Sequence, residues 1–414
     1  MHEFKYRSGR LYCENMKVES LAKKFGTPLY IYSYNTFIGH FLKLKKAFAG
    51  IDPLICYSVK ANSNLAILKA LVAEGAGLDI VSGGELFRAL KAGCDPRKIV
   101  YASVGKTAAE IEEAIEKGIL FFNVESLPEL ENINRISGRM GKRTNVAVRI
   151  NPDVEPKTHH YITTGKLTNK FGIDFNSALK ILSLSAKFSH VNIRGIHIHI
   201  GSQITESAPF VEAIKKVICF IAKLKARGID IEYLNIGGGL GIVYHHEKPQ
   251  TADEFARKVV PILKAGGLKI IMEPGRFIIG SAAILAAKVL YIKKTPLKNF
   301  VIVDAGMNDL VRPALYDAHH EIAALTQKSG AKAVKADVVG PICESGDFLA
   351  KARKLPEFKE GDYIAVMCTG AYGFSMAGNY NSRCRPAEVL VKGSKAKLIR
   401  RRESRGDLVR NEIC

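Results

Sequence analysis

The chain has 414 residues, of which 47% are hydrophobic and 24% charged, a composition typical of a soluble protein with more than one domain. Its net charge of +21 makes nucleic-acid binding a hypothesis to weigh, but the basic residues alternate with acidic ones and form no nucleic-acid-binding signature. Because the eight cysteines stand singly, no apolar run could cross a bilayer and the first residues lack a signal peptide's apolar stretch, we expect a reduced, cytoplasmic protein without nucleic-acid or membrane partners.

Apolar strand-like runs alternate with helical periodicity over roughly the first two thirds of the chain. A helix is predicted first, over Tyr34–Ala49. The predicted strands that follow are Leu54–Val59, Leu78–Val81, Ile99–Ala102, Leu120–Val124, Val146–Ile150, Ile193–Ile200, Ile231–Ile236 and Lys269–Met272. Helices predicted between them include Asn64–Glu74, Glu85–Ala92, Ala108–Lys117 and Ala208–Arg227. Eight β/α units predict an α/β fold, a (β/α)8 barrel, over residues 30–280.

The pattern changes after about residue 285, where short β-rich runs replace the helical periodicity. These runs are Lys288–Lys293, Phe300–Asp304, Ala336–Val339, Tyr363–Met367, Ala387–Val391 and Ala396–Arg400. They predict a β-sandwich or β-barrel domain. Since Pro28–Ser33 is typical of a strand that crosses between domains, we expect this second domain to comprise residues 1–29 and 281–414.

Lys60 ends the first predicted strand, in the run Tyr57-Ser58-Val59-Lys60-Ala61-Asn62. Burial lowers the pKa of a lysine, and the neutral amine can then form a Schiff base with a carbonyl compound. A surface lysine at a strand end is the ordinary alternative. The reactive interpretation is favoured because further chemical motifs stand at the ends of the other strands.

The carboxyl ends of barrel strands meet at one mouth, where such barrels carry their active sites. The motifs at these ends are Ser82-Gly83-Gly84-Glu85, Arg149-Ile150-Asn151, His199-Ile200-Gly201-Ser202, Gly237-Gly238-Gly239 and Glu273-Pro274-Gly275-Arg276. A glycine-rich backbone can cradle a phosphate, and a carboxylate can hold a proton on a heterocyclic nitrogen. The alternatives are a plain turn for the glycines, a core histidine bonded to the backbone for His199 and an ion pair for Glu273 and Arg276. With a reactive lysine, this set predicts pyridoxal 5′-phosphate as the cofactor.

The run that contains Lys60 and the motifs that begin at His199, Gly237 and Glu273 resemble those of the alanine-racemase-like, fold type III enzymes, and the C-terminal half resembles the diaminopimelate decarboxylases. The C-terminal motifs are Asp304-Ala305-Gly306-Met307-Asn308-Asp309-Leu310, Arg312-Pro313-Ala314-Leu315-Tyr316, Gly340-Pro341-Ile342-Cys343-Glu344-Ser345-Gly346-Asp347 and Gly370-Ala371-Tyr372-Gly373-Phe374-Ser375-Met376. The resemblance extends from Gly26 to Glu403. One departure is Cys384, where the family usually carries proline.

The resemblance implies decarboxylation of meso-2,6-diaminopimelate to L-lysine, the last step of lysine biosynthesis. It implies that Lys60, His199 and Cys343 are catalytic, with Lys60 bound to the cofactor, His199 stacked on its ring and Cys343 returning a proton to the α-carbon. Further cofactor contacts are implied for Ser202, Gly237, Gly238, Gly239, Glu273, Pro274, Gly275, Arg276 and Tyr372. For an isolated cysteine, a buried structural thiol is the ordinary alternative.

The substrate carries an amino-acid group at each end, so the site also has to bind the end that does not react. By resemblance, this falls to Arg276, Arg312, Tyr316, Glu344 and Tyr372. An arginine fork pairs well with a carboxylate. A surface ion pair for Arg312 and a packing role for Tyr316 are the alternatives, and the spacing of these two places them on one side of any helix there.

The resemblance also implies a homodimer whose active sites are shared, with Cys343 and its neighbours supplied by the partner subunit. The loop Pro152–Asn176 is a candidate lid. No metal is expected. The competing hypotheses are a related ornithine or arginine decarboxylase, an alanine racemase, a non-enzymatic protein that holds pyridoxal phosphate, and a nucleic-acid binder.

Overall fold

The computed structural model describes residues 2–155, 170–330 and 332–413, which divide into two compact units. The barrel unit comprises residues 40–242 and 248–277, and the β-rich unit comprises residues 1–39, 243–247 and 278–414. The boundaries expected from the sequence, 30–280 against 1–29 with 281–414, stay a prediction. Most of the loop predicted to be a lid, residues 156–169, lies outside the described residues.

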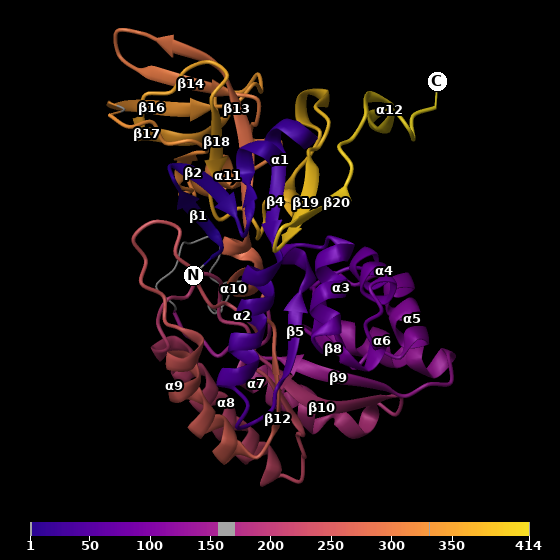
Figure 1. Ribbon diagram of the computed structural model, residues 1–414. Helices are drawn as coiled ribbons and strands as arrows, with labels where there is room; N and C mark the ends of the chain where they lie inside the picture. Colours follow the sequence, from indigo (N-terminus) through magenta and orange to yellow (C-terminus); the bar gives the residue numbers. More distant parts are fainter. Residues whose placement is uncertain (1, 156–169, 331, 414) are drawn as a thin grey trace. The chain divides into compact units, whose positions relative to one another are not determined.

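The barrel unit is built on a closed barrel of parallel strands in the order β10-β11-β12-β5-β6-β7-β8-β9 (Figure 1). Every strand predicted for the barrel is present, so the predicted (β/α)8 fold is confirmed. The bounds are β5 Leu54–Ser58, β6 Gly77–Ile80, β7 Ile99–Tyr101, β8 Phe121–Val124, β9 Thr144–Arg149, β10 Val191–His197, β11 Tyr233–Asn235 and β12 Lys269–Met272.

Most helices of this part of the chain join successive barrel strands and lie around the outside of the barrel, while the first precedes β5 and the last follows β12 (Figure 1). They are α2 Tyr34–Ala47, α3 Leu65–Ala73, α4 Gly83–Lys91, α5 Ala108–Lys117, α6 Leu127–Arg139, α7 Phe175–Ser183, α8 Ala208–Lys225, α9 Ala252–Gly266 and α10 Arg276–Ile279. Their starts follow from local side chains. Thr107, for example, accepts a hydrogen bond from the backbone of Glu110, whose side chain bonds back to Thr107. This capping box satisfies two backbone groups at the start of α5 that would otherwise lack partners.

Strands buried on both faces form the barrel, as expected for a parallel sheet covered by helices. Inside it, Cys56, Val100, Phe121 and Ile271 form one apolar cluster, each at most 1% exposed. Polar side chains therefore stand out where they interrupt these strands, and several do so at the carboxyl ends.

The β-rich unit contains a small sheet, β1-β2-β3, and a larger one whose main path runs β17-β16-β14-β13-β4-β19-β20, with β18 bridging β13 and β15. The bounds are β1 Phe4–Arg7, β2 Arg10–Cys13, β3 Met16–Lys17, β4 Leu29–Ser33, β13 Ala283–Lys294, β14 Asn299–Val303, β15 Ile322–Ala324, β16 Ala333–Val339, β17 Phe348–Pro356, β18 Tyr363–Val366, β19 Ala387–Lys392 and β20 Lys395–Arg400. Its helices are α1 Val18–Phe25, α11 Arg312–Tyr316 and α12 Arg405–Leu408.

The N-terminal strand β4 joins segments that are far apart in the sequence. It pairs antiparallel with β13 and parallel with β19. Leu29 and Ile31 of β4 are fully buried and belong to the same apolar core as Ile284 and Val389. The strand predicted at Pro28–Ser33 is thus present, and its pairing explains how residues near the N-terminus become part of a C-terminal domain.

Candidate functional site

Lys60 follows β5 in a single 3-10 turn, Val59–Ala61. Its Nζ lies 2.7 Å from Oδ2 of Asp79, a fully buried carboxylate in β6, and its own side chain is 36% exposed. Burial, and secondly the negative charge of Glu273, raise the pKa of Asp79, while Lys60 opposes that rise. Ser58 Oγ donates to the same Asp79 oxygen over 2.7 Å. Lys60 therefore contacts a buried carboxylate through its amine while part of its side chain remains accessible.

Glu273 ends β12 and is buried with three polar partners. Its Oε1 accepts from Nδ2 of Asn123 and Nδ2 of Asn235, at 3.1 and 2.6 Å. Its Oε2 lies 3.1 Å from Nε2 of His197. Burial alone would raise the pKa of Glu273, but His197 and the charge of Lys60 outweigh it and hold this pKa well below the usual range. The side chain is a fixed anion.

Three buried polar atoms around this carboxylate have no hydrogen-bond partner in the described part of the chain. They are Oδ1 of Asp79, Oδ1 of Asn123 and Nδ1 of His197, which stand in three different barrel strands. Buried polar atoms are nearly always paired, so a set of orphans calls for an explanation. A polar ligand at this end of the barrel supplies one.

His199 stands two residues beyond the end of β10, half-buried. Its Nδ1 accepts from the backbone N–H of Gly238 over 3.2 Å, which leaves the ring proton on Nε2 in the neutral form. Burial, followed by the charges of Arg149 and Lys60, holds the pKa of His199 well below its ordinary value. It is a neutral, flat ring, suited to stacking on an aromatic ligand.

The Gly237–Gly239 loop has no room for side chains. A Cβ on Gly238 would lie 2.0 Å from the carbonyl oxygen of Glu273, and one on Gly239 would lie 2.3 Å from that of Gly201. The N–H of Gly237 donates to Oδ1 of Asn235 over 2.9 Å. Since the N–H groups of Gly237 and Gly238 are engaged within the protein, the loop's main contribution here is close backbone packing.

Ser202 and Arg276 form a hydrogen-bonded pair. The Arg276 guanidinium donates to Oγ of Ser202 from Nε and Nη2, at 3.3 and 3.1 Å. Next to Arg276, a Cβ on Gly275 would lie 3.0 Å from the Cβ atoms of Ala61 and Ser58. The carbonyl of Pro274 accepts from the N–H of Ser58 over 3.2 Å. A buried guanidinium with a hydroxyl beside it fits a phosphate.

Taken together, the barrel residues fit pyridoxal phosphate. They offer an amine, a fixed anion with orphaned polar neighbours, a flat neutral ring and an arginine–serine pair.

Gly238→Ala is expected to weaken cofactor binding by about tenfold or more and to lower the melting temperature, because the new methyl group would displace the backbone of Glu273. A cofactor titration followed by absorbance, together with a thermal melt, measures both effects. Gly105→Ala is the matched control, since a Cβ there meets nothing within 4 Å. Unchanged cofactor affinity in Gly238→Ala would contradict the packing argument.

The β-rich unit holds the other predicted site residues. Cys343 and Glu344 lie exposed in the loop after β16, which excludes the buried structural thiol as an interpretation of Cys343. The backbone N–H of Cys343 donates to Oδ1 of Asn381 over 2.7 Å, and the hydroxyl of Tyr380 reaches Oε2 of Glu344 at 3.5 Å. The carboxylate of Asp347 accepts from the N–H of Ile342 over 2.6 Å. These contacts fix the loop's backbone while leaving the thiol accessible.

Arg312 and Tyr316 stand at the two ends of α11, so the stretch is helical, which is the condition under which their spacing places them on one side. Arg312 is buried, whereas Tyr316 is half-buried. Tyr372 is half-buried as well and adopts a positive φ of 58°. The structure thus brings together the barrel residues of the predicted site, and it places the remaining ones within the β-rich unit.

Sequence reasoning missed several polar residues of the barrel mouth. Asp79, His197 and Asn235 contact predicted residues. Glu85, by contrast, belongs to the predicted motif Ser82-Gly83-Gly84-Glu85, and its pKa is raised to about 7, mainly by burial, with the Lys60 charge opposing. A usable signal existed for Asp79. A charged residue inside the apolar run Leu78-Asp79-Ile80 is costly unless it serves a purpose.

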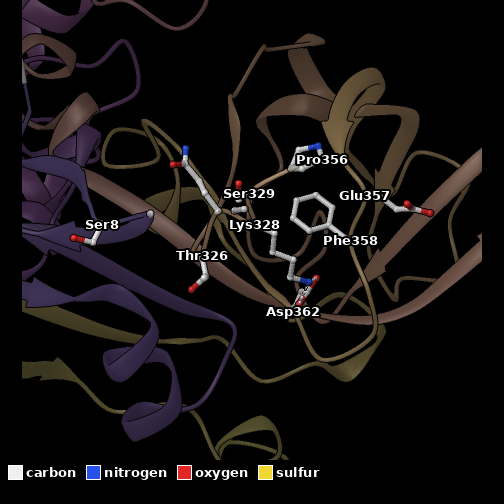
Figure 2. Close-up of a pocket in the computed structure, with 11 residues that line it drawn as sticks. Ser8, Thr326, Lys328, Ser329, Pro356, Glu357, Phe358 and Asp362 are labelled. Carbon is white, nitrogen blue, oxygen red and sulfur yellow. Dashed lines mark hydrogen bonds and ion pairs between the residues drawn. The ribbon is translucent and has the colours of Figure 1, made fainter. Parts of the chain in front are cut away.

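The β-rich unit also contains a cavity of about 650 Å³ (Figure 2). None of the predicted site residues lines it. Its charged lining residues are Lys328 and Asp362, which pair at 2.7 Å, and Glu357, whose carboxylate lies 3.7 Å from Nζ of Lys294. The lining residues are Ser8, Gly9, Ala324, Thr326, Gln327, Lys328, Ser329, Pro356, Glu357, Phe358 and Asp362.

Two classes of feature are absent from residues 2–155, 170–330 and 332–413. No helix there has the length and apolar character needed to span a membrane. No group of three or more histidine, cysteine or acidic side chains there is placed to hold a metal ion.

Comparisons with known proteins agree with this chemistry. A family model described as "Pyridoxal-dependent decarboxylase, pyridoxal binding domain" matches residues 35–280. The diaminopimelate decarboxylase of Aquifex aeolicus is 50% identical over 400 residues, covering 96% of this chain and 94% of that relative. Diaminopimelate decarboxylase from Helicobacter pylori complexed with L-lysine has a TM-score of 0.92 and 44% identity, covering 95% of this chain and 98% of that one. The M. jannaschii enzyme in co-complex with L-lysine has a TM-score of 0.95 and 39% identity, covering 100% and 99%.

Proposed function

The chain belongs to the diaminopimelate decarboxylases, within the pyridoxal-dependent decarboxylase family, and from this we propose that it converts meso-2,6-diaminopimelate to L-lysine and CO2. The proposed place of this reaction is the last step of lysine biosynthesis. The structural observation that carries the proposal is the pairing of Lys60 with buried Asp79 beside the fixed anion Glu273. The L-lysine complexes of two similar enzymes support the proposed product.

Pyridoxal phosphate, when bound, supplies an aldehyde that links to amines and a ring that accepts the electron pair left by departing CO2. Lys60 is the proposed anchoring amine, and Asp79, 2.7 Å away, is placed to exchange a proton with its Nζ. Glu273 supplies the negative charge that favours a protonated ring nitrogen. His199 offers its neutral ring face for stacking.

The phosphate contacts proposed are Arg276 and Ser202, which already touch, with the loop Gly237–Gly239, Pro274, Gly275 and Tyr372. Arg276 and Tyr372 are also proposed to contact the substrate. Close backbone packing at the loop brings main-chain groups near the ligand without side chains in between.

At the end of the substrate that keeps its carboxylate, we assign the carboxylate to Arg312 and Tyr316 and the ammonium to Glu344. A guanidinium fork matches a carboxylate, and an exposed carboxylate can pair with an ammonium. Cys343 is the proposed acid that returns a proton to the α-carbon, and its exposed thiol is compatible with that role.

CO2 release from purified, cofactor-loaded protein, offered meso-diaminopimelate, ornithine and arginine in parallel, tests the function. L-Lysine formed from diaminopimelate alone is the expected result. Turnover of ornithine or arginine would instead favour the alternative, a related basic amino-acid decarboxylase, and would overturn the roles given to Arg312 and Glu344.

A homodimer is proposed as the working form, with Cys343 and Glu344 of one subunit completing the barrel site of its partner. The exposure of both side chains in the single chain supports this proposal. Light scattering coupled to gel filtration measures the oligomeric state, and a fully active monomer would contradict it.

Mixing two inactive variants gives a sharper test of shared sites. Lys60→Ala and Cys343→Ala are each expected to be nearly inactive alone. After dissociation and reassociation, half of the dimers are hybrids with one intact site, so activity should return to about a quarter of the wild-type value. If both residues of a site came from one chain, no activity would return on mixing.

We also propose that the protein works in the cytoplasm. The seven described cysteines are all free thiols, which suits a reducing compartment. Cell fractionation with an antibody against the chain measures its location.

A further inference from the structure

Arg312 is held by a histidine that no part of the proposed mechanism uses. Nη1 of Arg312 lies 2.9 Å from Nε2 of His320, and both residues are buried, His320 completely. On the other side of the ring, Nδ1 lies 2.8 Å from the carbonyl oxygen of Met367. A carbonyl can only accept, so Nδ1 carries the ring proton. The neutral Nε2 is therefore the acceptor for the guanidinium.

A neutral acceptor has a specific consequence for an arginine. The imidazole fixes the direction of the guanidinium without adding a negative charge that would cancel the positive charge of Arg312. A carboxylate in the same position would compete with an anionic ligand. His320 thus orients Arg312 while leaving its attraction for a carboxylate intact.

Tyr244 restrains both residues. The Arg312 guanidinium lies 4.7 Å from the centroid of the Tyr244 ring, within range of a cation–π contact. The same ring packs edge-on against His320, with centroids 5.3 Å apart and planes at 78°. Tyr244 belongs to the short segment Val243–Glu247, which groups with the β-rich unit although barrel residues precede and follow it in the chain. Imidazole and phenol together confine the guanidinium.

We propose that His320 is a positioning residue for substrate specificity: its Nε2 orients the Arg312 guanidinium toward the carboxylate that the substrate retains. The proposal rests on the function proposed above. Loss of one CO2 from diaminopimelate leaves the other amino-acid end unchanged, so L-lysine keeps the carboxylate that Arg312 would bind. Cadaverine, the corresponding diamine, has neither carboxylate and serves as the matched probe.

Two substitutions at position 320 separate the two hydrogen bonds. His320→Asn keeps a donor where Nδ1 faces Met367 and loses the acceptor for Arg312. His320→Gln keeps an acceptor where Nε2 stands. In His320→Asn we expect the KM for meso-diaminopimelate and the inhibition constant of L-lysine to rise about tenfold or more, the usual contribution of a hydrogen bond to a charged group. The kcat and the inhibition constant of cadaverine should change far less, and His320→Gln should recover much of the loss.

The neighbouring histidine provides a control in the same loop. His319 contacts Arg353 and His245 rather than Arg312, so His319→Asn is expected to leave both inhibition constants unchanged. Should His320→Asn fail to fold, Arg312→Lys is the second variant. It keeps the positive charge but loses the forked guanidinium, so we expect it to weaken the binding of L-lysine but not that of cadaverine.

Each outcome decides a separate point. If His320→Asn weakened the binding of L-lysine and of cadaverine equally, the role of His320 would be structural and the inference would be overturned. Unchanged affinity for L-lysine in His320→Asn or in Arg312→Lys would overturn it as well. In both cases wild-type turnover of meso-diaminopimelate would leave the proposed function standing. Wild-type protein that releases no CO2 from this substrate would remove the proposed function, and the inference with it.

Discussion

Replacing Lys60 by arginine is expected to abolish CO2 release from meso-diaminopimelate, by on the order of 10³-fold or more, while the protein stays folded. The guanidinium keeps the positive charge that Asp79 needs, since Asp79 is fully buried and lies 2.7 Å from the lysine nitrogen. It does not keep the chemistry, because arginine remains protonated and is a very poor nucleophile toward an aldehyde. Turnover assays and a thermal melt measure the two effects separately.

Lys60→Ala provides the comparison. It removes the charge as well as the amine and leaves Asp79 buried without its cation, so we expect it to lower both activity and stability. An arginine variant that retained activity would mean that Lys60 serves only as the partner of Asp79. Dialysis against buffer, with the bound cofactor followed by absorbance, tests the same point. If Lys60 is the covalent anchor, both variants should lose the cofactor more readily than the wild type. If Lys60 only pairs with Asp79, the arginine variant should retain it.

The fold was largely predictable because its two periodicities are strong. Buried parallel strands appear as continuous apolar runs, and the helices between them have a polar face, so the barrel strands were found within a few residues of their bounds. Sequence reasoning missed the short strands β1 to β3, together with β15 and β17. β1 to β3 have only two to four residues each and form a small sheet of their own, so their pattern is too short to recognise. β15 has three residues and pairs with the distant β18. β17 pairs with its neighbour β16, but Lys351, Arg353 and Lys354 interrupt its apolar run.

The barrel site was predictable to the extent that its residues follow strands. Lys60, His199 and Glu273 were placed by that rule, and their contacts agree with a common location. The polar residues within strands, such as Asp79 and Asn235, were missed because their partners come from other strands. His320 was missed for a related reason. Its acceptor role depends on Met367 fixing the tautomer from a distant position in the chain.

Glu273→Gln is expected to lower kcat on the order of 10²-fold or more while the cofactor still binds. The amide has nearly the same shape and can still accept from Asn123 and Asn235 through its oxygen. It lacks the charge, however, and the pKa of Glu273 is held below its usual range by His197 and the Lys60 charge, so the wild-type side chain is an anion at neutral pH. What the variant removes is therefore an electrostatic contribution, present before the reaction begins and directed at a protonated ring nitrogen.

A loss of activity could also come from removing any buried carboxylate, and the barrel offers a control. Glu129 pairs with fully buried Lys106 at 2.6 Å, outside the proposed site. Glu129→Gln is expected to lower stability at least as much as Glu273→Gln, because it removes the carboxylate that pairs with a buried ammonium, yet to keep its kcat. If the two variants lost activity in proportion to stability, the effect of Glu273 would be structural. A fall in kcat confined to Glu273→Gln, with the cofactor bound in both, would assign it to the negative charge at the end of β12.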